Sequence, residues 1–420
     1  MQPDAPIPTR RPRLLGPAAR AAVEPFHVMK VWAAAARRAE RGLRVFNLSA
    51  GQPSTPAPKP VLAAAHASLD GQILGYTEAL GIAPLREAIA GHYRHRYRLE
   101  VDPAQVVVTT GSSGGFLVAF LAAFDAGARV GLARPGYPAY RNVLTALGCE
   151  VVDVPTGAAT RFQPTAAMLE GLNLDGLIVA SPANPTGTMV PDSELAALNR
   201  YCADNGIRLI SDEIYHGITY SDPDLETRGS PVRPVSSWAT DRSGFVVNSF
   251  SKYFSMTGWR IGWLLVPADL AEAVDALAGN LAICPPAPAQ YAALAAFDAD
   301  SYAECDAHVQ RYAANRDLLI GGLRRLGVDR LAPADGAFYV YADVGELLDG
   351  ADALPDSEAL CWDLLERAGI ATAPGRDFDP VDGGRFLRMS FAGSAETLRG
   401  ALESLERYLA STALRGGPGR

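Results

Sequence analysis

The sequence of 420 residues has little of what marks membrane or secreted proteins. Its longest unbroken apolar run, Phe116 to Phe124, has about half of the roughly 20 residues that a membrane-spanning helix requires. Its first residues, MQPDAPIPTRRPRLL, contain no apolar signal core and no small-residue cleavage site. We therefore expect a cytoplasmic protein with no membrane partner.

Cysteine and histidine are also scarce, with five and six residues in the whole chain. There is no CxxC pair and no spacing of cysteine with histidine that is typical of a metal site. We expect reduced, mostly buried thiols and no metal. His92 and His95 lie three residues apart in an Arg-rich stretch, which favours an exposed helix face over a metal-binding pair.

Positive charge is not in excess. The chain has 38 Lys and Arg against 46 Asp and Glu, a net charge of −8, so no basic face for nucleic acid is expected. With 48% hydrophobic and 20% charged residues, the composition excludes disordered, fibrous and coiled-coil proteins. The length is sufficient for two domains.

Short apolar runs alternate with Ala/Leu-rich segments of helical length from about residue 75 onward. Continuously apolar strands separated by helices are typical of a parallel sheet covered on both faces. The prediction is an α/β fold with a large, mostly parallel, helix-covered sheet. The predicted strands are residues 106–108, 130–132, 151–154, 177–180, 207–210, 245–247 and 261–266.

The pattern changes near residue 300, where we place the boundary between a large domain, 47–300, and a smaller α+β domain, 301–420. The N-terminal segment, 1–46, is assigned to the smaller domain. It consists of a Pro/Arg-rich flexible arm of 25 residues followed by a helix and a short strand. The smaller domain's predicted elements are helix 301–326, strand 336–341, helix 357–368, strand 386–391, helix 395–410 and a disordered tail, 415–420.

A dense group of polar residues follows the predicted strand at 245–247. Polar side chains at the C-terminal end of such a strand lie where open α/β sheets bind ligands. Lys252 stands close to Phe250 and other aromatic residues, and burial among them would lower its amine pKa and favour Schiff-base chemistry. Ser249, Ser251 and Arg260 are donors suited to an oxyanion or a phosphate. A lone lysine is usually a surface charge, so that alternative stays open here.

Two other strand ends carry polar residues. Asp212 ends an apolar strand, and Tyr215 follows it by three residues. Asn184 lies in a Pro/Asn/Gly turn after the strand at 177–180. Each has an ordinary structural alternative, namely a strand-terminal cap for Asp212 and plain turn chemistry for Asn184.

Ser112 and Ser113 lie in a Gly/Ser loop between a strand and a helix that we expect to begin at Phe116. Backbone N–H groups and the helix dipole make such a loop a suitable phosphate site. The loop contains neither GK[ST] nor GxGxxG, which disfavours nucleotide binding. Gly-rich turns between a strand and a helix also occur for packing reasons alone.

Taken together, these segments resemble the class I/II aminotransferases, pyridoxal 5'-phosphate (PLP) enzymes of fold type I in the aspartate aminotransferase superfamily. The resemblance covers most of the chain and rests on order and spacing. Asn184 precedes Asp212 by 28 residues, Tyr215 follows Asp212 by three, Lys252 follows Asp212 by 40, and Arg260 follows Lys252 by eight.

The resemblance implies a role for each of these residues toward PLP. Lys252 would form a Schiff base with the cofactor and act as general acid and base. Asp212 would keep the pyridine nitrogen protonated, and Tyr215 and Asn184 would hydrogen-bond the phenolate oxygen. The other implied contacts are Tyr137 on the ring face, and Ser112, Ser113, Ser249, Arg260 and Tyr76 of the partner subunit on the phosphate.

Substrate contacts are implied in the same way. Arg388 would bind the α-carboxylate through its planar guanidinium, beside Asn184 and the backbone of Gly51. Arg385 is three residues earlier on an alternating strand, so it is expected to point to the opposite face. Arg376 could bind an anionic side chain or be a surface charge. The contact from Tyr76 implies a homodimer with a shared active site.

The implied reaction is a ping-pong transfer of the amino group of an α-amino acid to a 2-oxo acid. A PLP-dependent lyase, acting by β-elimination, C–S cleavage or decarboxylation-coupled deamination, is the alternative, because the cofactor contacts are common to both. A DNA-binding regulator built on this fold is disfavoured, since the resemblance already begins near residue 47 and the net charge is negative.

Overall fold

A computed structural model describes residues 16–220, 234–349 and 354–413. The predicted disordered tail lies outside these residues, as does most of the predicted flexible arm. The described end of the arm contains a short 3₁₀ helix, Ala19–Ala21.

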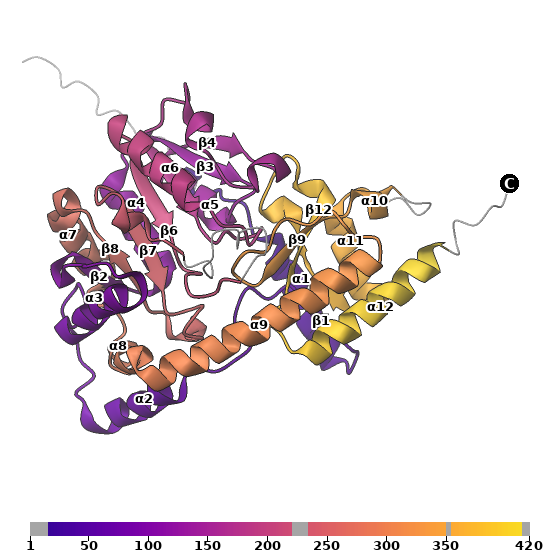
Figure 1. Cartoon of the computed structure of the whole chain (residues 1–420), viewed down its shortest axis with the longest axis horizontal. Helices are drawn as coiled ribbons and strands as arrows, with labels where there is room; N and C mark the ends of the chain where they lie inside the picture. The colour runs from indigo at the N-terminus through magenta and orange to yellow at the C-terminus, as the bar shows by residue number, and fades with distance from the viewer. Residues whose placement is uncertain (1–15, 221–233, 350–353, 414–420) are drawn as a thin grey trace, which may run out of the picture.

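The centre of the molecule is a seven-stranded sheet with the order β2-β8-β7-β6-β5-β3-β4 (Figure 1). Six strands run in one direction, and β8 is antiparallel to both of its neighbours, β2 and β7. The predicted α/β class is confirmed, and each predicted strand is present. The strands are β2 (Val106–Thr109), β3 (Arg129–Arg134), β4 (Glu150–Pro155), β5 (Gly176–Ala180), β6 (Arg208–Asp212), β7 (Phe245–Ser249) and β8 (Gly262–Leu265).

Helices cover both faces of this sheet, which explains why its strands are apolar without alternation. In β5, Ile178 packs in the apolar cluster of one face, while Leu177 and Val179 pack in that of the other. The first face is covered by α4 (Gly111–Ala123), α5 (Pro138–Leu147) and α7 (Ala271–Ala282), and the second by α6 (Asp192–Asp204).

Two smaller sheets lie to one side of the large sheet (Figure 1). One is antiparallel, with the order β11-β12-β9. The other pairs β1 with β10 in parallel, so that Phe46 lies opposite Ile370 and the N-terminal segment joins the C-terminal part of the chain. The strands are β1 (Phe46–Asn47), β9 (Tyr339–Asp343), β10 (Ile370–Ala371), β11 (Ala373–Pro374) and β12 (Phe386–Ser390).

The long helix α9 (Ala299–Arg325) connects the two parts of the molecule. It begins near α2 (Lys59–Gly71) and α8 (Ala287–Leu294) and ends beside α12 (Ala395–Ala413) (Figure 1). The remaining helices are α1 (His27–Glu40), α3 (Ala83–Tyr97), α10 (Gly345–Leu348) and α11 (Ser357–Asp363), which continues as a π-helical turn, Leu364–Ala368.

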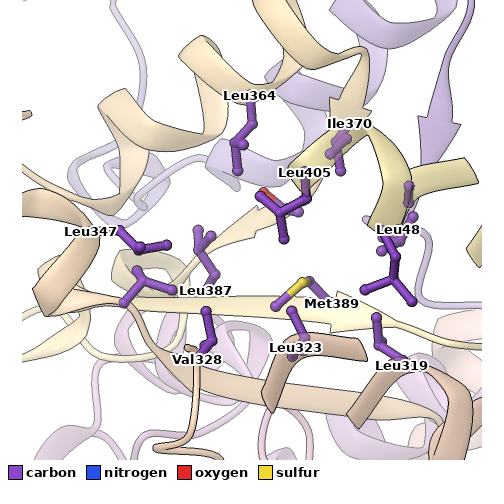
Figure 2. Close-up of a pocket in the computed structure, with 14 residues that line it drawn as sticks. Leu48, Leu319, Leu323, Val328, Leu347, Leu364, Ile370, Leu387, Met389 and Leu405 are labelled. Atoms are coloured by element: carbon purple, nitrogen blue, oxygen red, sulfur yellow. The ribbon is translucent and has the colours of Figure 1, made fainter. Parts of the chain in front are cut away.

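Apolar side chains from β12, α9 and α12 form the core of the smaller part. Figure 2 shows Leu387 and Met389 of β12 surrounded by leucines, among them Leu323 of α9 and Leu405 of α12. The space left between them is about 20 Å³, close to the room one water molecule needs, and nearly all of its lining is apolar. We interpret it as a packing gap rather than a ligand site.

The expectation of an exposed face at His92 and His95 is wrong for His92. His95 is exposed, but His92 is buried in a group of aromatic rings, with its Nδ1 2.7 Å from the hydroxyl of Tyr302. Burial, aided by the charge of Arg96, lowers the pKa of His92 to about 3. The Arg-rich neighbours concealed the fact that His92 lies on the inner face of α3.

All five cysteines are free thiols, and four of them are buried. Among the described residues, no helix is long and apolar enough to cross a membrane.

Candidate active site

A cavity of about 330 Å³ lies at the C-terminal ends of the central strands, between the large sheet and the smaller part of the chain. Side chains from β6, the turn after β7, β9 and β12 meet there. The predicted site residues that line it are Gly51, Ser112, Ser113, Tyr137, Asn184, Asp212, Tyr215, Lys252, Arg260 and Arg388. Ser249 and Tyr76 do not line it.

Lys252 stands in the turn after β7 and points its amine into the cavity. Nζ donates a hydrogen bond to the carbonyl oxygen of Gly51 at 2.8 Å and lies 5.6 Å from the ring centre of Tyr215. Burial, followed by the charge of Arg388, lowers the pKa of Lys252 from 10.5 to about 8, and the opposing effect of Asp212 is smaller. An amine with this pKa loses its proton in mildly alkaline solution, more than two pH units below an ordinary lysine, and can then act as nucleophile or base.

Asp212 ends β6 and is only 3% exposed. One carboxylate oxygen accepts a hydrogen bond from the hydroxyl of Tyr140, and the other accepts from the backbone N–H of Ile214 at 3.1 Å. Burial raises the pKa of Asp212 to about 6, against the opposing effect of these hydrogen bonds. The carboxyl group is therefore placed to pair with a cationic nitrogen in the cavity.

Tyr140 and Tyr339 were not among the predicted site residues. Tyr140 lies in α5, three residues after Tyr137, which immediately precedes the helix, and the centres of the two rings are 5.4 Å apart. Tyr339 lies on β9, and its hydroxyl is 2.7 Å from that of Tyr215. A side chain at Gly51 would place its Cβ 3.0 Å from the Tyr339 hydroxyl, so the chain approaches β9 closely at this glycine.

Arg388 on β12 is a buried cation, 4% exposed, aimed into the cavity. Nη1 donates to Oδ1 of Asn184 at 2.9 Å, and Nη2 donates to the carbonyl oxygen of Ser49 at 2.8 Å. The guanidinium carbon lies 4.4 Å from the ring centre of Tyr339 and 4.8 Å from that of Phe378. Its Nε has no hydrogen-bond partner among the described residues. Such a group favours binding of a planar anion.

Arg385 and Arg376 behave differently from Arg388. Arg385 is half exposed and pairs with Asp343 at 3.1 Å. Arg376 is also half exposed, and it pairs with Asp356 at 3.1 Å. It lines a neighbouring cavity of about 410 Å³ and not the one that contains Lys252. These contacts favour the surface-charge interpretation of Arg376.

The predicted start of α4 at Phe116 is wrong, because the helix begins at Gly111. The glycines of the predicted loop belong to the helix, and Gly115 packs closely against β8, where a Cβ would lie 3.1 Å from Leu264. Ser112 and Ser113 thus belong to the first turn of the helix. Their N–H groups lack the usual helical acceptors and are free for an anion.

The first turn of α4 faces Arg260. A Cβ built on Gly111 would lie 2.6 Å from Nη2 of Arg260, and one built on Gly262 would lie 3.0 Å from the backbone nitrogen of Ser112. The absence of side chains at these two glycines lets the backbone N–H groups and the guanidinium come together. The result is a cradle suited to a phosphate.

Ser249 and Tyr76 are the predicted residues that the cavity does not include. Ser249 is buried, and its Oγ accepts from the backbone N–H of Ser251 at 3.0 Å and donates to the carbonyl oxygen of Ile261 at 3.3 Å. Ser251 lines the cavity instead. Tyr76 is 84% exposed on the outside of the molecule. The predicted phosphate contacts of Ser249 and Tyr76 stay predictions.

Comparison with known proteins identifies the family. Residues 44–405 match the family model described as "Aminotransferase class I and II". The chain is 55% identical over 396 residues to a valine–pyruvate aminotransferase of Mycobacterium tuberculosis, covering 94% of this chain and 98% of that protein. It is 34% identical to an aspartate aminotransferase of Thermotoga maritima, covering 89% and 93% of the two chains.

Solved structures of similar proteins support the same family. A putative aminotransferase from Silicibacter pomeroyi superposes with a TM-score of 0.85 at 45% identity, covering 94% of this chain and all of that one. Aspartate aminotransferase from Thermus thermophilus, solved with maleate, has a TM-score of 0.85 at 31% identity and the same coverage. These findings favour amino-group transfer over the lyase alternative. The chain belongs to the class I and II aminotransferases and is an enzyme that transfers amino groups between amino acids and 2-oxo acids.

Proposed function

We propose that this enzyme is a PLP-dependent aminotransferase that uses valine, or another α-amino acid with a small apolar side chain, as donor and pyruvate as acceptor. The observation that carries the proposal is the buried amine of Lys252, with a pKa near 8, in a cavity that has a carboxylate at one place and a phosphate cradle at another. The donor set fits PLP group by group.

The N–H groups of Ser112 and Ser113 and the guanidinium of Arg260 suit the phosphate. Asp212 suits a protonated pyridine nitrogen, and Lys252 would hold the cofactor covalently. Tyr137 would contact the ring face of the cofactor, and Tyr215 and Asn184 would hydrogen-bond its phenolate oxygen. When bound, PLP supplies an electron sink for the negative charge that develops at the substrate α-carbon.

The other steps belong to the chain's own residues. Arg388 binds the α-carboxylate through its guanidinium and so orients the substrate α-carbon toward Lys252. Released from the cofactor by the substrate amine, Nζ of Lys252 would remove the α-proton. It would then deliver a proton to the cofactor's aldehyde carbon, because return of the proton to the α-carbon would only regenerate the amino acid. Removal of the α-proton requires a neutral amine, and a pKa of about 8 makes the neutral fraction of Lys252 at neutral pH far larger than a pKa of 10.5 would.

The choice of valine and pyruvate rests on the relative from Mycobacterium tuberculosis and on the lining of the cavity. That relative is a valine–pyruvate aminotransferase with 55% identity. Apolar side chains line the cavity, among them Val28, Met29, Trp32 and Val143. A branched apolar side chain would be stabilised by burial against them.

We further propose a homodimer with a shared active site, in which Tyr76 reaches the phosphate cradle of the partner subunit. Support comes from exposed apolar side chains that precede this residue in the sequence and from others at the end of α7. Ile73 is 96% exposed, and Leu69, at the end of α2, is 62% exposed. Leu281 and Ile283, at the end of α7, are exposed as well. Apolar side chains exposed in this number mark a protein interface. The cytoplasmic location stays a prediction from the sequence.

The proposed reaction is tested with purified enzyme, a panel of amino acids and pyruvate as acceptor. We expect alanine and the 2-oxo acid of the donor in equal amounts, with the highest kcat/KM for valine and its close analogues. Turnover without pyruvate, with release of ammonia, carbon dioxide or a side-chain fragment, would assign a lyase reaction instead.

The shared site is tested by mixing two defective subunits. Lys252→Ala and Tyr76→Phe homodimers should each be impaired. Hybrid dimers should regain activity, because one of their two sites combines Lys252 from one chain with Tyr76 from the other. A hybrid dimer that does not regain activity would contradict an active site shared between the two subunits.

A further inference from the structure

One wall of the cavity comes from the beginning of α1, far from the catalytic segments in sequence. Phe26, Val28, Met29 and Trp32 line this wall. None of them belongs to the proposed cofactor or carboxylate contacts. They are therefore available to contact the part of the substrate that varies between amino acids, the side chain.

Asp377 lines the cavity beside this wall and holds it in place. One carboxylate oxygen accepts from the backbone N–H of His27 and the other from that of Val28, each at 2.7 Å. These are the first two residues of α1, whose N–H groups have no helical acceptor. Burial raises the pKa of the Asp377 carboxyl, and the two hydrogen bonds from α1 oppose this shift. Together with the positive end of the helix, these hydrogen bonds stabilise the ionised carboxylate.

The described charged residues of the cavity lining leave no cation for a second substrate carboxylate. Its three cations are engaged under the proposed function, Lys252 and Arg260 with the cofactor and Arg388 with the α-carboxylate of the substrate. A second carboxylate on the substrate side chain would find no further lysine or arginine among the described lining residues. It would instead meet the negative charge of Asp377 and the apolar wall of α1.

We propose that Asp377 is a specificity residue that discriminates against dicarboxylic substrates, through its own negative charge in the cavity and by fixing the apolar first turn of α1 there. This inference rests on the proposed function, because it takes Arg388 as the site of the α-carboxylate. Like charges in a partly buried site repel more strongly than in water, so the expected discrimination is roughly tenfold or more.

The test measures binding of two unreactive analogues by isothermal titration calorimetry on the PLP-loaded enzyme. Isovalerate is valine without its amino group, and succinate is aspartate without its amino group, so neither can be turned over. Wild-type enzyme should bind isovalerate at least tenfold more tightly than succinate. Asp377→Asn removes the charge and keeps the shape of the side chain. This variant should narrow the ratio of the two affinities by roughly tenfold, mainly because succinate binds more tightly.

Glu358→Gln is the matched control. Glu358 also anchors the beginning of α1, because its Oε1 lies 3.0 Å from Nδ1 of His27, but it does not line the cavity. This variant should keep the wild-type ratio. Asp377→Ser, which retains one acceptor for α1 and no charge, should narrow the ratio as Asp377→Asn does.

Three results would overturn the proposal. The ratio could be unchanged in Asp377→Asn and Asp377→Ser, or Glu358→Gln could narrow it equally, which would assign the effect to the position of α1 alone. Alternatively, both Asp377 variants could lower the affinities for isovalerate and succinate by the same factor. Failure of the proposed function would look different, since wild-type enzyme would then transfer no amino group from valine to pyruvate.

Discussion

Replacing Lys252 by methionine should stabilise the enzyme when its cofactor is removed. The folded chain lowers the pKa of this amine from 10.5 to about 8, because burial and the charge of Arg388 disfavour its protonated form. At 1.36 kcal/mol per pKa unit, the charged amine costs about 3 kcal/mol of stability at pH 7. Methionine removes the charge but also the hydrogen bond to Gly51, worth about 1 kcal/mol. The expected net gain at pH 7 is about 2 kcal/mol.

The gain should disappear in alkaline solution. The pKa of Lys252 is lower in the folded state than in the unfolded state, so the cost is complete below pH 8 and lost as the pH rises toward 10.5. At pH 10 the wild-type amine is neutral in the fold, and the remaining cost is about 1 kcal/mol, which the lost hydrogen bond offsets.

The assay is thermal unfolding of cofactor-free wild type and Lys252→Met at pH 7 and pH 10, at one protein concentration. Titrating groups that do not interact with Lys252 contribute equally to both proteins, so the difference between them reports Lys252 together with Asp212, whose pKa is raised by burial and lowered by the charge of Lys252. Lys59→Met, at an exposed lysine, is the control and should show no pH-dependent difference. A Lys252→Met protein that melts below wild type at pH 7, or a difference that is equal at both pH values, would refute the reasoning.

Three further substitutions have definite expected outcomes. Arg388→Lys keeps the charge but loses the planar fork that bonds Asn184, so kcat/KM for valine should fall roughly 10- to 100-fold in steady-state assays. Tyr140→Phe removes a donor that lowers the pKa of Asp212, so that pKa should rise above about 6 and the acidic limb of the pH–rate profile should move to higher pH. Leu387→Ala in the core of Figure 2 should cost about 2–5 kcal/mol, measured by denaturant unfolding, and leave the KM for valine unchanged.

The large sheet could be predicted because its strands are buried on both faces and therefore read as continuous apolar runs. Candidate site residues could be predicted where a reactive side chain stands at the end of a strand or directly after it, as Asp212 and Lys252 do. Parallel strands bring their C-terminal ends to one edge of the sheet, so residues that are distant in sequence, such as Asn184, meet there.

Other features depend on contacts that no local pattern records. The helix α4 begins at Gly111 although glycines disfavour helices. Gly111 has a φ of +71°, and at Gly115 the close approach of Leu264 in β8 leaves no room for a side chain. Tyr339 contacts the hydroxyl of Tyr215 in the cavity. It belongs to a strand whose sequence is apolar and aromatic, and this pattern gives no sign of a functional residue. The role of Asp377 is visible only once the beginning of α1 is seen to lie against it.

The most direct test of the account is to locate the cofactor on the chain. The sequence has only three lysines, Lys30, Lys59 and Lys252, so borohydride reduction of the PLP-loaded enzyme followed by peptide mass mapping gives an unambiguous answer. The account predicts one reduced cofactor per chain, on Lys252, and none in a Lys252→Ala variant. Attachment to Lys30 or Lys59, or no attachment in an enzyme that still transfers amino groups from valine to pyruvate, would contradict it.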